Sequence, residues 1–285
     1  MSGALSTARK SRIGYLLQLL TRQRFESRYA TERATLILCA LSISLSGCAQ
    51  DYSLGPPADS ELMTITVKVP EELEAETMKV MYRSSTCKRV SLGGSGQRVE
   101  RDGHHAISVQ LQRQGQSDLY QAKLPMDGGG MCKWHLANVT FGVAYANPTR
   151  FGEGVTYGAG GGVVVVFDHN SSPRGGTGIK VDGDLTIKKG YYPWLSEAFL
   201  GGYRKQINLA GEGSIYIAYQ ALQARNVYFE PVLHSNFVVY SVGPKVKKEG
   251  NYTSITYPDG SIQTNGRWGP NFRKLEAIRQ AAEAK

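Results

Sequence analysis

The residues with the most catalytic potential in this chain are two adjacent histidines near an acidic residue. His104 and His105 closely follow Asp102, a set of side chains that could transfer protons or bind a metal ion. Adjacent residues of a strand point to opposite faces, so both imidazoles could not easily share one metal ion. The other histidines are far apart in the sequence: His135, His169 and His234. The pattern therefore predicts no metal site.

Three further patterns are compatible with catalysis but have simpler explanations. Ser95 stands between two glycines, without the Gly-x-Ser-x-Gly spacing of a hydrolase nucleophile elbow. The glycines within 158–162 precede an apolar run, whereas a dinucleotide-binding fingerprint follows a strand and opens a helix. Asp182 and Asp184 could share a face, but a turn explains this pair without paired-carboxylate catalysis. We therefore predict that the chain is not an enzyme and needs no cofactor.

A lipid-attachment signal is the most specific motif. An apolar run from Ala34 to Leu45 follows the basic Arg33 and leads into Leu45-Ser46-Gly47-Cys48. The run is about a dozen residues long, whereas a helix needs roughly 20 to cross a bilayer core. The stretch resembles the lipobox of bacterial lipoproteins. The resemblance implies cleavage before Cys48, with fatty acyl chains such as palmitate on its thiol and on the new amino end.

The residue after the lipobox cysteine bears on location. Ala49 stands there rather than an aspartate. By analogy with enterobacterial lipoproteins, this favours a lipid anchor in the outer membrane, with the protein facing the periplasm. The alternative for this stretch is a short N-terminal anchor, or a buried helix that contains a cysteine by chance.

Cleavage at the lipobox would leave Cys87 and Cys132 as the cysteines of the mature body. An even number of cysteines in an oxidising compartment predicts a disulfide. Closing a loop of this size is worth roughly 4 kcal/mol in the chain-entropy estimate. The alternative is a pair of buried free thiols. Two cysteines without a nearby histidine pair make a poor zinc site.

The mature chain, residues 48–285, is mildly basic. The whole sequence has 33 Lys and Arg against 24 Asp and Glu, and the leader contains seven of the former and two of the latter. The mature net charge is therefore +4, with 26 basic and 22 acidic residues. This value is weak evidence for nucleic-acid binding, and a periplasmic location weakens it further. Basic runs at 88–89 and 245–248 could meet anionic headgroups or an acidic partner, although a solvated face is the simpler explanation.

Alternating apolar residues separated by Gly and Pro turns predict a mainly β protein. Residues 63–69 alternate with period two, and Val163 to Phe167 form a candidate for a fully buried strand. We expect an antiparallel β-sandwich-like body of one or two halves with a short C-terminal helix. The expected parts are a signal peptide (1–47), a flexible tether (48–60), an N-terminal β-sandwich half (61–148), a C-terminal β-rich half (149–268) and a helix (269–285).

Local patterns in the second half predict three smaller elements. Asp182-Gly183 and Pro258-Asp259-Gly260 each indicate a hairpin turn between short strands. Residues 193–200, closed by two glycines, predict one or two helical turns.

Aromatic residues provide the candidate binding surface. The chain has 16 Tyr against 8 Phe and 3 Trp, and tyrosine is enriched at protein contact surfaces. We expect the loops 157–162 and 191–203 to face a partner, because both combine glycine with aromatics. The candidate partner-binding residues are Tyr157, Tyr191, Tyr192, Trp194 and Tyr203. The alternative is ordinary packing of a β protein.

These observations favour a membrane-anchored protein that binds another protein at the periplasmic face. The organisation is similar to that of immunity lipoproteins, which neutralise antibacterial effectors, including phospholipases, delivered by type VI secretion. The resemblance covers the lipobox, the tether, the all-β body with two cysteines and the lack of a catalytic motif. A structural lipoprotein of an envelope or secretion assembly is the alternative, followed by a periplasmic hydrolase that uses His104 or His105.

Overall fold

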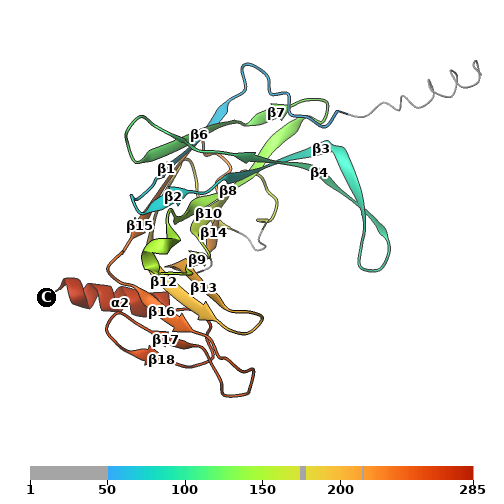
Figure 1. Cartoon of the computed structure of the whole chain (residues 1–285). Coiled ribbons are helices and arrows are strands. Elements are labelled where there is room, and N and C mark those ends of the chain that lie inside the picture. Colours follow the sequence, from blue (N-terminus) through green and yellow to red (C-terminus); the bar gives the residue numbers. More distant parts are fainter. Residues whose placement is uncertain (1–50, 174–177, 214, 285) are drawn as a thin grey trace, which may run out of the picture. The chain divides into compact units, whose positions relative to one another are not determined.

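Two mixed β-sheets packed together form the body of the protein, with one helix near its C-terminal end (Figure 1). The computed structural model describes residues 51–173, 178–213 and 215–284, so the expected signal peptide and Cys48 lie outside the described residues. Within these ranges one sheet has 10 strands and the other has 8. The mainly β prediction is confirmed.

The ten-stranded sheet has the order β18-β17-β16-β12-β15-β1-β6-β5, with β13 joined to β12 and β9 joined to β13. Its strands are β1 (Leu62–Lys68), β5 (Gln112–Arg113), β6 (Leu119–Pro125), β9 (Thr156–Tyr157), β12 (Leu185–Ala198), β13 (Arg204–Gly211), β15 (Asn226–Leu233), β16 (Val239–Val242), β17 (Ser254–Thr256) and β18 (Ile262–Gln263).

The eight-stranded sheet has the order β11-β14-β10-β8-β3-β4, with β2 and β7 joined to β8. Its strands are β2 (Leu73–Ala75), β3 (Met78–Leu92), β4 (Arg98–Val109), β7 (Asp127–Gly129), β8 (Trp134–Tyr145), β10 (Gly161–Val166), β11 (Ile179–Lys180) and β14 (Tyr216–Gln220). A 3₁₀ helix, η1 (Pro148–Phe151), follows β8.

Side-chain alternation explains how the sheets form one core. In β1, Met63, Ile65 and Val67 are fully buried, while the residues between them are only partly covered. β10 is buried along its whole length, as its run of valines predicts. The rings of Phe141 in β8 and Phe229 in β15 meet edge to face, with centroids 6.0 Å apart. This contact joins the two sheets.

Strand directions differ from the antiparallel expectation at several central positions. β1 pairs antiparallel with β6 but parallel with β15, and β12 is parallel to both β15 and β16. Strands from residues 61–148 and from residues 149–268 form two blocks of the ten-stranded sheet, which meet at the pair β1 and β15. The eight-stranded sheet is mixed in the same way, because β10 lies between β8 and β14.

Two local predictions in the second half are wrong. Residues 193–200 belong largely to β12 rather than to a helix, because they continue a strand that is covered on both faces. Asp182-Gly183 does not close a hairpin, because β11 pairs with β14 whereas β12 belongs to the other sheet. The hairpin expected around Pro258-Asp259-Gly260 is present as β17 and β18.

The segment expected to be a free tether is partly fixed to the body. Gly55 donates a backbone hydrogen bond to the Gly128 carbonyl (2.9 Å), and the Tyr52 carbonyl accepts one from the Trp134 indole (3.1 Å). Tyr52 and Gly55 therefore contact the body within the segment expected to be flexible.

The C-terminal helix, α2 (Phe272–Glu283), packs on a second and smaller hydrophobic cluster. Asn271 caps it, since its side chain accepts a hydrogen bond from the Lys274 backbone. Leu275 is fully buried against Tyr192 and Ile255, among other side chains of this cluster. No helix in the described part of the chain is both long and apolar enough to cross a bilayer.

Candidate functional site

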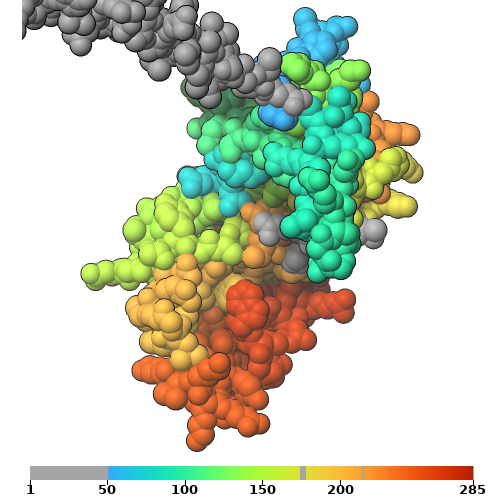
Figure 2. All heavy atoms as spheres, turned by 90° about the vertical axis from the view of Figure 1, so that its right-hand side faces the viewer, coloured from blue at the N-terminus to red at the C-terminus, as the bar shows by residue number. Residues whose placement is uncertain are grey.

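A two-stranded arm, defined here as residues 88–102, projects from the eight-stranded sheet (Figure 1). It contains the end of β3, the start of β4 and the glycine-rich turn between them. No residue of the arm is buried, and Val90 and Leu92 are 54% and 74% exposed. In Figure 2 the arm stands on the face turned toward the viewer. Such a ribbon contributes little to the core and offers both its faces to solvent.

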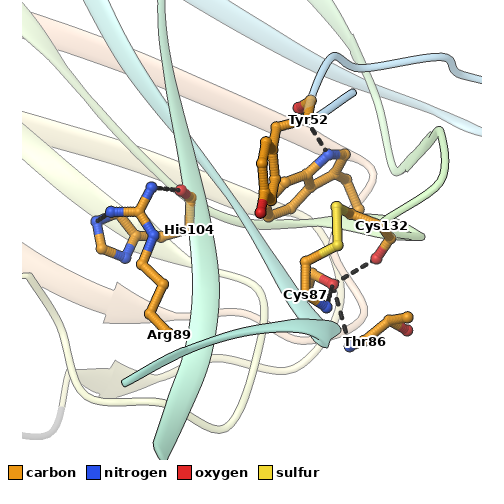
Figure 3. Close-up of a disulfide and its surroundings, with 8 residues drawn as sticks. Tyr52, Thr86, Cys87, Arg89, His104 and Cys132 are labelled. Carbon is orange, nitrogen blue, oxygen red and sulfur yellow. Dashed lines mark hydrogen bonds between the residues drawn. A yellow bond between two sulfur atoms is a disulfide. The ribbon is translucent and has the colours of Figure 1, made fainter. Parts of the chain in front are cut away.

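A disulfide fixes the base of the arm. Cys87 and Cys132 are joined, with their Cα atoms 5.2 Å apart, which confirms the predicted pairing (Figure 3). The bond lies in an irregular stretch where β3 carries extra residues between the pairs Ser84–Gly103 and Arg89–Arg101. An isolated two-stranded hairpin is marginally stable in water. The disulfide holds the arm in place, because the arm has no buried residues that could do so by packing.

Hydrogen bonds and a close approach hold the irregular stretch in place. The Ser84 hydroxyl donates to the Cys132 carbonyl and accepts from the backbone of Thr86 (3.1 Å) and Cys87 (2.9 Å). Gly103 passes so close that a Cβ atom there would stand 1.9 Å from the Cys87 carbonyl oxygen. A residue with a side chain at position 103 would displace the disulfide.

The base of the arm also holds the start of the described chain. The Trp134 indole donates to the Tyr52 carbonyl, and the His105 ring lies 5.5 Å from the Trp134 ring. A cavity of about 290 Å³ lies here, lined by Tyr52, Cys87, Lys88, Arg89, His104, His105 and Trp134.

A larger hollow beside the arm, here called the cationic cleft, is rich in basic groups. Its volume is about 630 Å³, and its lining consists of Arg83, Arg89, Val90, Ser91, Arg101, Asp102, His104 and Asn170. The Arg83 guanidinium pairs with Asp168 at 3.2 Å, while Arg89 contacts the His104 carbonyl at 3.4 Å. The cleft is therefore suited to an anionic group of a partner.

The surroundings of His104 disfavour its charged form. Burial lowers its pKa, and the guanidinium groups of Arg89 and Arg83 lower it further. The His104 ring lies beside Arg89, whereas the His105 ring packs on Trp134, so the two imidazoles have different neighbours. Among the described residues, no group of three or more His, Cys, Asp or Glu side chains could hold a metal ion.

The structure separates the five aromatic residues predicted to bind a partner. Tyr191, Tyr192 and Trp194 are buried within β12 rather than exposed in a loop. They are buried on successive positions because this part of β12 is covered on both faces. Tyr157 and Tyr203 are exposed, on β9 and beside the turn before β13.

The loop 157–162 is also less open than expected. Its glycines allow strands to approach closely instead of providing freedom: a Cβ at Gly161 would stand 2.2 Å from the Tyr191 ring. Gly160 likewise lies against the Val143 carbonyl. Only the Tyr157 end of this segment is exposed.

A polar cluster beneath α2 is the remaining group with catalytic side chains. The Tyr192 hydroxyl donates to Glu276, Arg279 donates to the Tyr192 hydroxyl (3.2 Å), and the His234 ring stacks on Tyr192 with centroids 4.9 Å apart. Burial and the Glu276 hydrogen bond raise the pKa of Tyr192, while burial and the charge of Arg279 lower that of His234. These groups satisfy one another and attach the helix to β12.

The sequence contains a pattern that indicates the arm, but the predicted binding surface was based on loop aromatics instead. Val90 and Leu92 alternate with polar residues immediately before Gly93-Gly94-Ser95-Gly96, which is a strand running into a turn. No protein-family model matches the chain, and no curated protein or solved structure matches it either. The functional interpretation therefore depends on the lipobox and on the geometry of the arm.

Proposed function

We propose that this chain is a membrane-anchored lipoprotein that binds a protein partner through the arm. The observation that carries the proposal is an arm with no buried residue that presents Val90 and Leu92 to solvent from a base fixed by a disulfide. Apolar side chains surrounded by polar ones are the usual arrangement at the centre of a protein interface. The disulfide lowers the entropy that the arm loses when a partner binds.

The cationic cleft supports an acidic partner surface. Arg89 and Arg101 face each other across the arm, and both contribute to the cleft. A concentration of one charge accelerates association with an oppositely charged surface and discriminates against wrong partners. We therefore propose that the partner presents carboxylates next to an apolar patch.

The lipid anchor follows from the lipobox. In this proposal Cys48 carries the acyl chains and holds the body at the periplasmic side of the outer membrane. Replacing it, as in Cys48→Ser, should move the chain from the membrane pellet to the soluble fraction and abolish incorporation of an alkyne-labelled fatty acid. Continued labelling of the variant would contradict lipidation at this residue.

The most specific form of the proposal is an immunity lipoprotein. Its partner would be an antibacterial effector, of phospholipase type, delivered by type VI secretion. An inhibitor of this kind needs complementary shape and charge near the membrane, and needs no catalytic group of its own. The exposed arm offers the first requirement and the cationic cleft the second.

Site-specific photo-crosslinking in living cells tests the proposal. A benzophenone amino acid at Leu92 of the full-length chain samples the arm, and the same group at Ile262, which is 66% exposed in β18, is the matched control. We expect one crosslinked protein from Leu92 and none of that mass from Ile262. Equal patterns from both positions would remove the arm from the proposal.

The identity of the crosslinked protein tests the specific form. If it is an effector, its expression in the periplasm should arrest growth, and co-expression of this chain should restore growth. Leu92→Asp should lose the protection while the chain remains at normal abundance. Full protection by Leu92→Asp would overturn the immunity role of the arm.

A second candidate function, a structural subunit of an envelope assembly, is favoured by the edge of β4. Within the described residues, β4 pairs only with β3, so the other edge of this 12-residue strand is open for pairing. Crosslinks from Leu92 to several envelope proteins within one large complex would favour this candidate over the immunity role.

A further inference from the structure

Two connections meet at one end of the ten-stranded sheet, and we call them together the tip. They are the turn from β12 into the start of β13, residues 199–205, and the loop between β16 and β17, residues 243–253. Because β12 and β16 are parallel neighbours, their carboxyl ends lie at the same edge of the sheet. In Figure 1 both connections lie in the lower part of the view, whereas β7, beside the start of the described chain, lies at the top.

Contacts join the two parts of the tip. The backbone of Gly243 donates a hydrogen bond to the Glu197 carbonyl at 2.8 Å, where the loop leaves β16. The Lys245 ammonium lies 5.4 Å from the centroid of the Phe199 ring. The Phe199 ring in turn lies 5.4 Å from the Tyr203 ring. The tip is therefore one continuous surface rather than two independent loops.

The tip exposes apolar side chains at the end of the sheet. Leu200 and Tyr203 of the turn are 42% and 61% exposed. Val246 and Tyr252 of the loop are 63% and 53% exposed. Single exposed apolar residues are common, but several on adjoining connections, surrounded by charges, indicate a contact with a protein or a membrane.

Cations surround these apolar side chains. Lys245, Lys247 and Lys248 are all exposed, and none of them forms an ion pair with another residue of the described chain. Arg204 adds a fourth cation, and Glu249 is the single acidic residue of the tip. The fifth basic residue of the tip is compensated by a carboxylate of β12, which leaves a surplus of three positive charges. The tip therefore carries three of the four net positive charges of the mature chain.

The types of these side chains favour a lipid surface over a protein surface. Protein interfaces are enriched in arginine and depleted of lysine, whereas three of the four uncompensated cations of the tip are lysines. A long lysine side chain can lie along apolar material while its ammonium group stays at a polar boundary. Tyrosine rings are enriched at the level of lipid headgroups. Positive charge among these residues selects headgroups that are anionic.

We propose that the tip docks on the surface of a phospholipid bilayer with anionic headgroups. The lysine ammonium groups pair with headgroup phosphates, while Leu200 and Val246 enter the boundary between the headgroups and the acyl chains. Tyr203 and Tyr252 lie at the level of the headgroups. The tip is separate from the arm and from the anchor proposed at Cys48, so this contact depends on neither.

Photo-crosslinking to a tagged lipid tests the contact on the full-length chain. The chain is reconstituted into vesicles of phosphatidylcholine, with or without phosphatidylglycerol, and both kinds contain a trace of alkyne-tagged phosphatidylcholine. The reactive lipid is then the same, and only the surface charge differs. A benzophenone amino acid at Val246 samples the tip, and the same group at Ile262, which is 66% exposed in β18, is the control. We expect phosphatidylglycerol to raise the yield of lipid-tagged chain from Val246 about tenfold and to leave that from Ile262 unchanged.

Matched charge variants separate the tip from the net charge of the chain. The double variant Lys247→Gln, Lys248→Gln should lose about tenfold of the crosslink from Val246 on the anionic vesicles. The double variant Lys123→Gln, Lys180→Gln removes the same charge from exposed positions of β6 and β11, and should keep the full yield. High salt should lower the yield of the natural chain to that on neutral vesicles, because it screens exposed charges.

Flotation of the vesicles separates this proposal from the anchor. A chain that fails to float with neutral vesicles contradicts the anchor, while the crosslink from Val246 on anionic vesicles still tests the tip. Equal yields from Val246 on the two kinds of vesicle overturn the docking, as does an equal loss in both double variants. In living cells, a crosslink from Val246 to an acidic protein in place of lipid would also overturn it and assign the tip to that protein.

Discussion

Lys189 shows how one buried side chain can reduce stability. The strand β12 places it where only 6% of its surface meets solvent. Burial disfavours the charged form of an amine, which is the reason for its lowered pKa. Its neighbour Lys188 has the same charge but keeps it in water beside Glu230. Adjacent lysines of β12 therefore differ in the free energy needed to keep the ammonium group charged.

This difference predicts a pH-dependent stability. The pKa of Lys189 falls from 10.5 to about 8 in the folded chain, so between these values the unfolded chain binds more protons and stability rises with pH. At pH 7, Lys189→Met should have a higher free energy of unfolding than the natural chain, by up to about 3 kcal/mol, and should unfold at a higher urea concentration. This difference in unfolding free energy should disappear by pH 10.5.

Urea titrations at pH 7, 9 and 10.5 provide the measurement, with Lys188→Met as the control. That variant should show no pH-dependent gap, because its side chain is mostly in solvent. A gap for Lys189→Met that stays constant across this range would mean that the ammonium is not the source of the difference.

The aromatic residues of β12 show why the exposure of a side chain could not be predicted from the sequence. Alternation identified β1 correctly, since Met63, Ile65 and Val67 face the core. Tyr191 and Tyr192 are adjacent and are both buried, because β12 has the core on one face and α2 on the other. Aromatics on successive positions resemble an exposed cluster until the second layer is known. The disulfide could be predicted without knowing the fold, because only two cysteines of the mature body remained to pair.

The arm depends on a covalent link rather than on packing. Its strands lie beyond the last buried residue of β3, and the disulfide closes a separation of 45 residues at the base. The helix α2 is instead held by a buried apolar side chain and by the cap at its N-terminal end. The two elements should therefore respond to different perturbations.

Removal of the disulfide should loosen the arm and lower global stability. The double variant Cys87→Ser, Cys132→Ser should lose roughly 2–4 kcal/mol of unfolding free energy, measured by urea titration. It should also weaken the Leu92 crosslink, since a mobile arm loses more entropy on binding. Treatment of the natural chain with a reductant should reproduce the loss. Equal stability of the two forms would mean that packing alone holds the arm.

Truncation of the buried helix residue should release α2. Leu275→Ala removes a side chain that is fully buried in the second cluster and should cost about 2–5 kcal/mol. Arg273→Ala, on the exposed side of the same helix, should change stability by less than about 0.5 kcal/mol. Thermal melts followed by circular dichroism compare them, and similar melts for both variants would contradict the packing role of Leu275.

Each sequence half contributes strands to both sheets, and in each sheet the two halves meet at one strand pair. β1 lies between β6 and β15 in the ten-stranded sheet, and β8 lies between β3 and β10 in the eight-stranded one. Parallel neighbours such as β1 and β15 cannot be read from local patterns, because alternation shows which face of a strand is buried and not which strand lies beside it. This is why the sequence predicted the strands better than their order.

The shared strand pairs predict that neither half is stable alone. A fragment of residues 61–148 lacks β15 and β10, so β1 and β8 would each have an unpaired edge, and Phe141 would lose its contact with Phe229. We expect no cooperative thermal transition for this fragment by circular dichroism, whereas the full chain should show one. A cooperative transition in the fragment would show that the halves fold separately.

The pairing of β1 with β15 also constrains the timing of folding. Lys68 of β1 and Glu230 of β15 form an ion pair although they are 162 positions apart, so the sheet cannot close until nearly the whole chain has left the ribosome. Contacts between such distant segments form slowly. The anchor proposed at Cys48 would require export of the chain in an extended form. For such a chain the late pairing of β1 with β15 would be an advantage, because the ten-stranded sheet stays incomplete while the chain is being made.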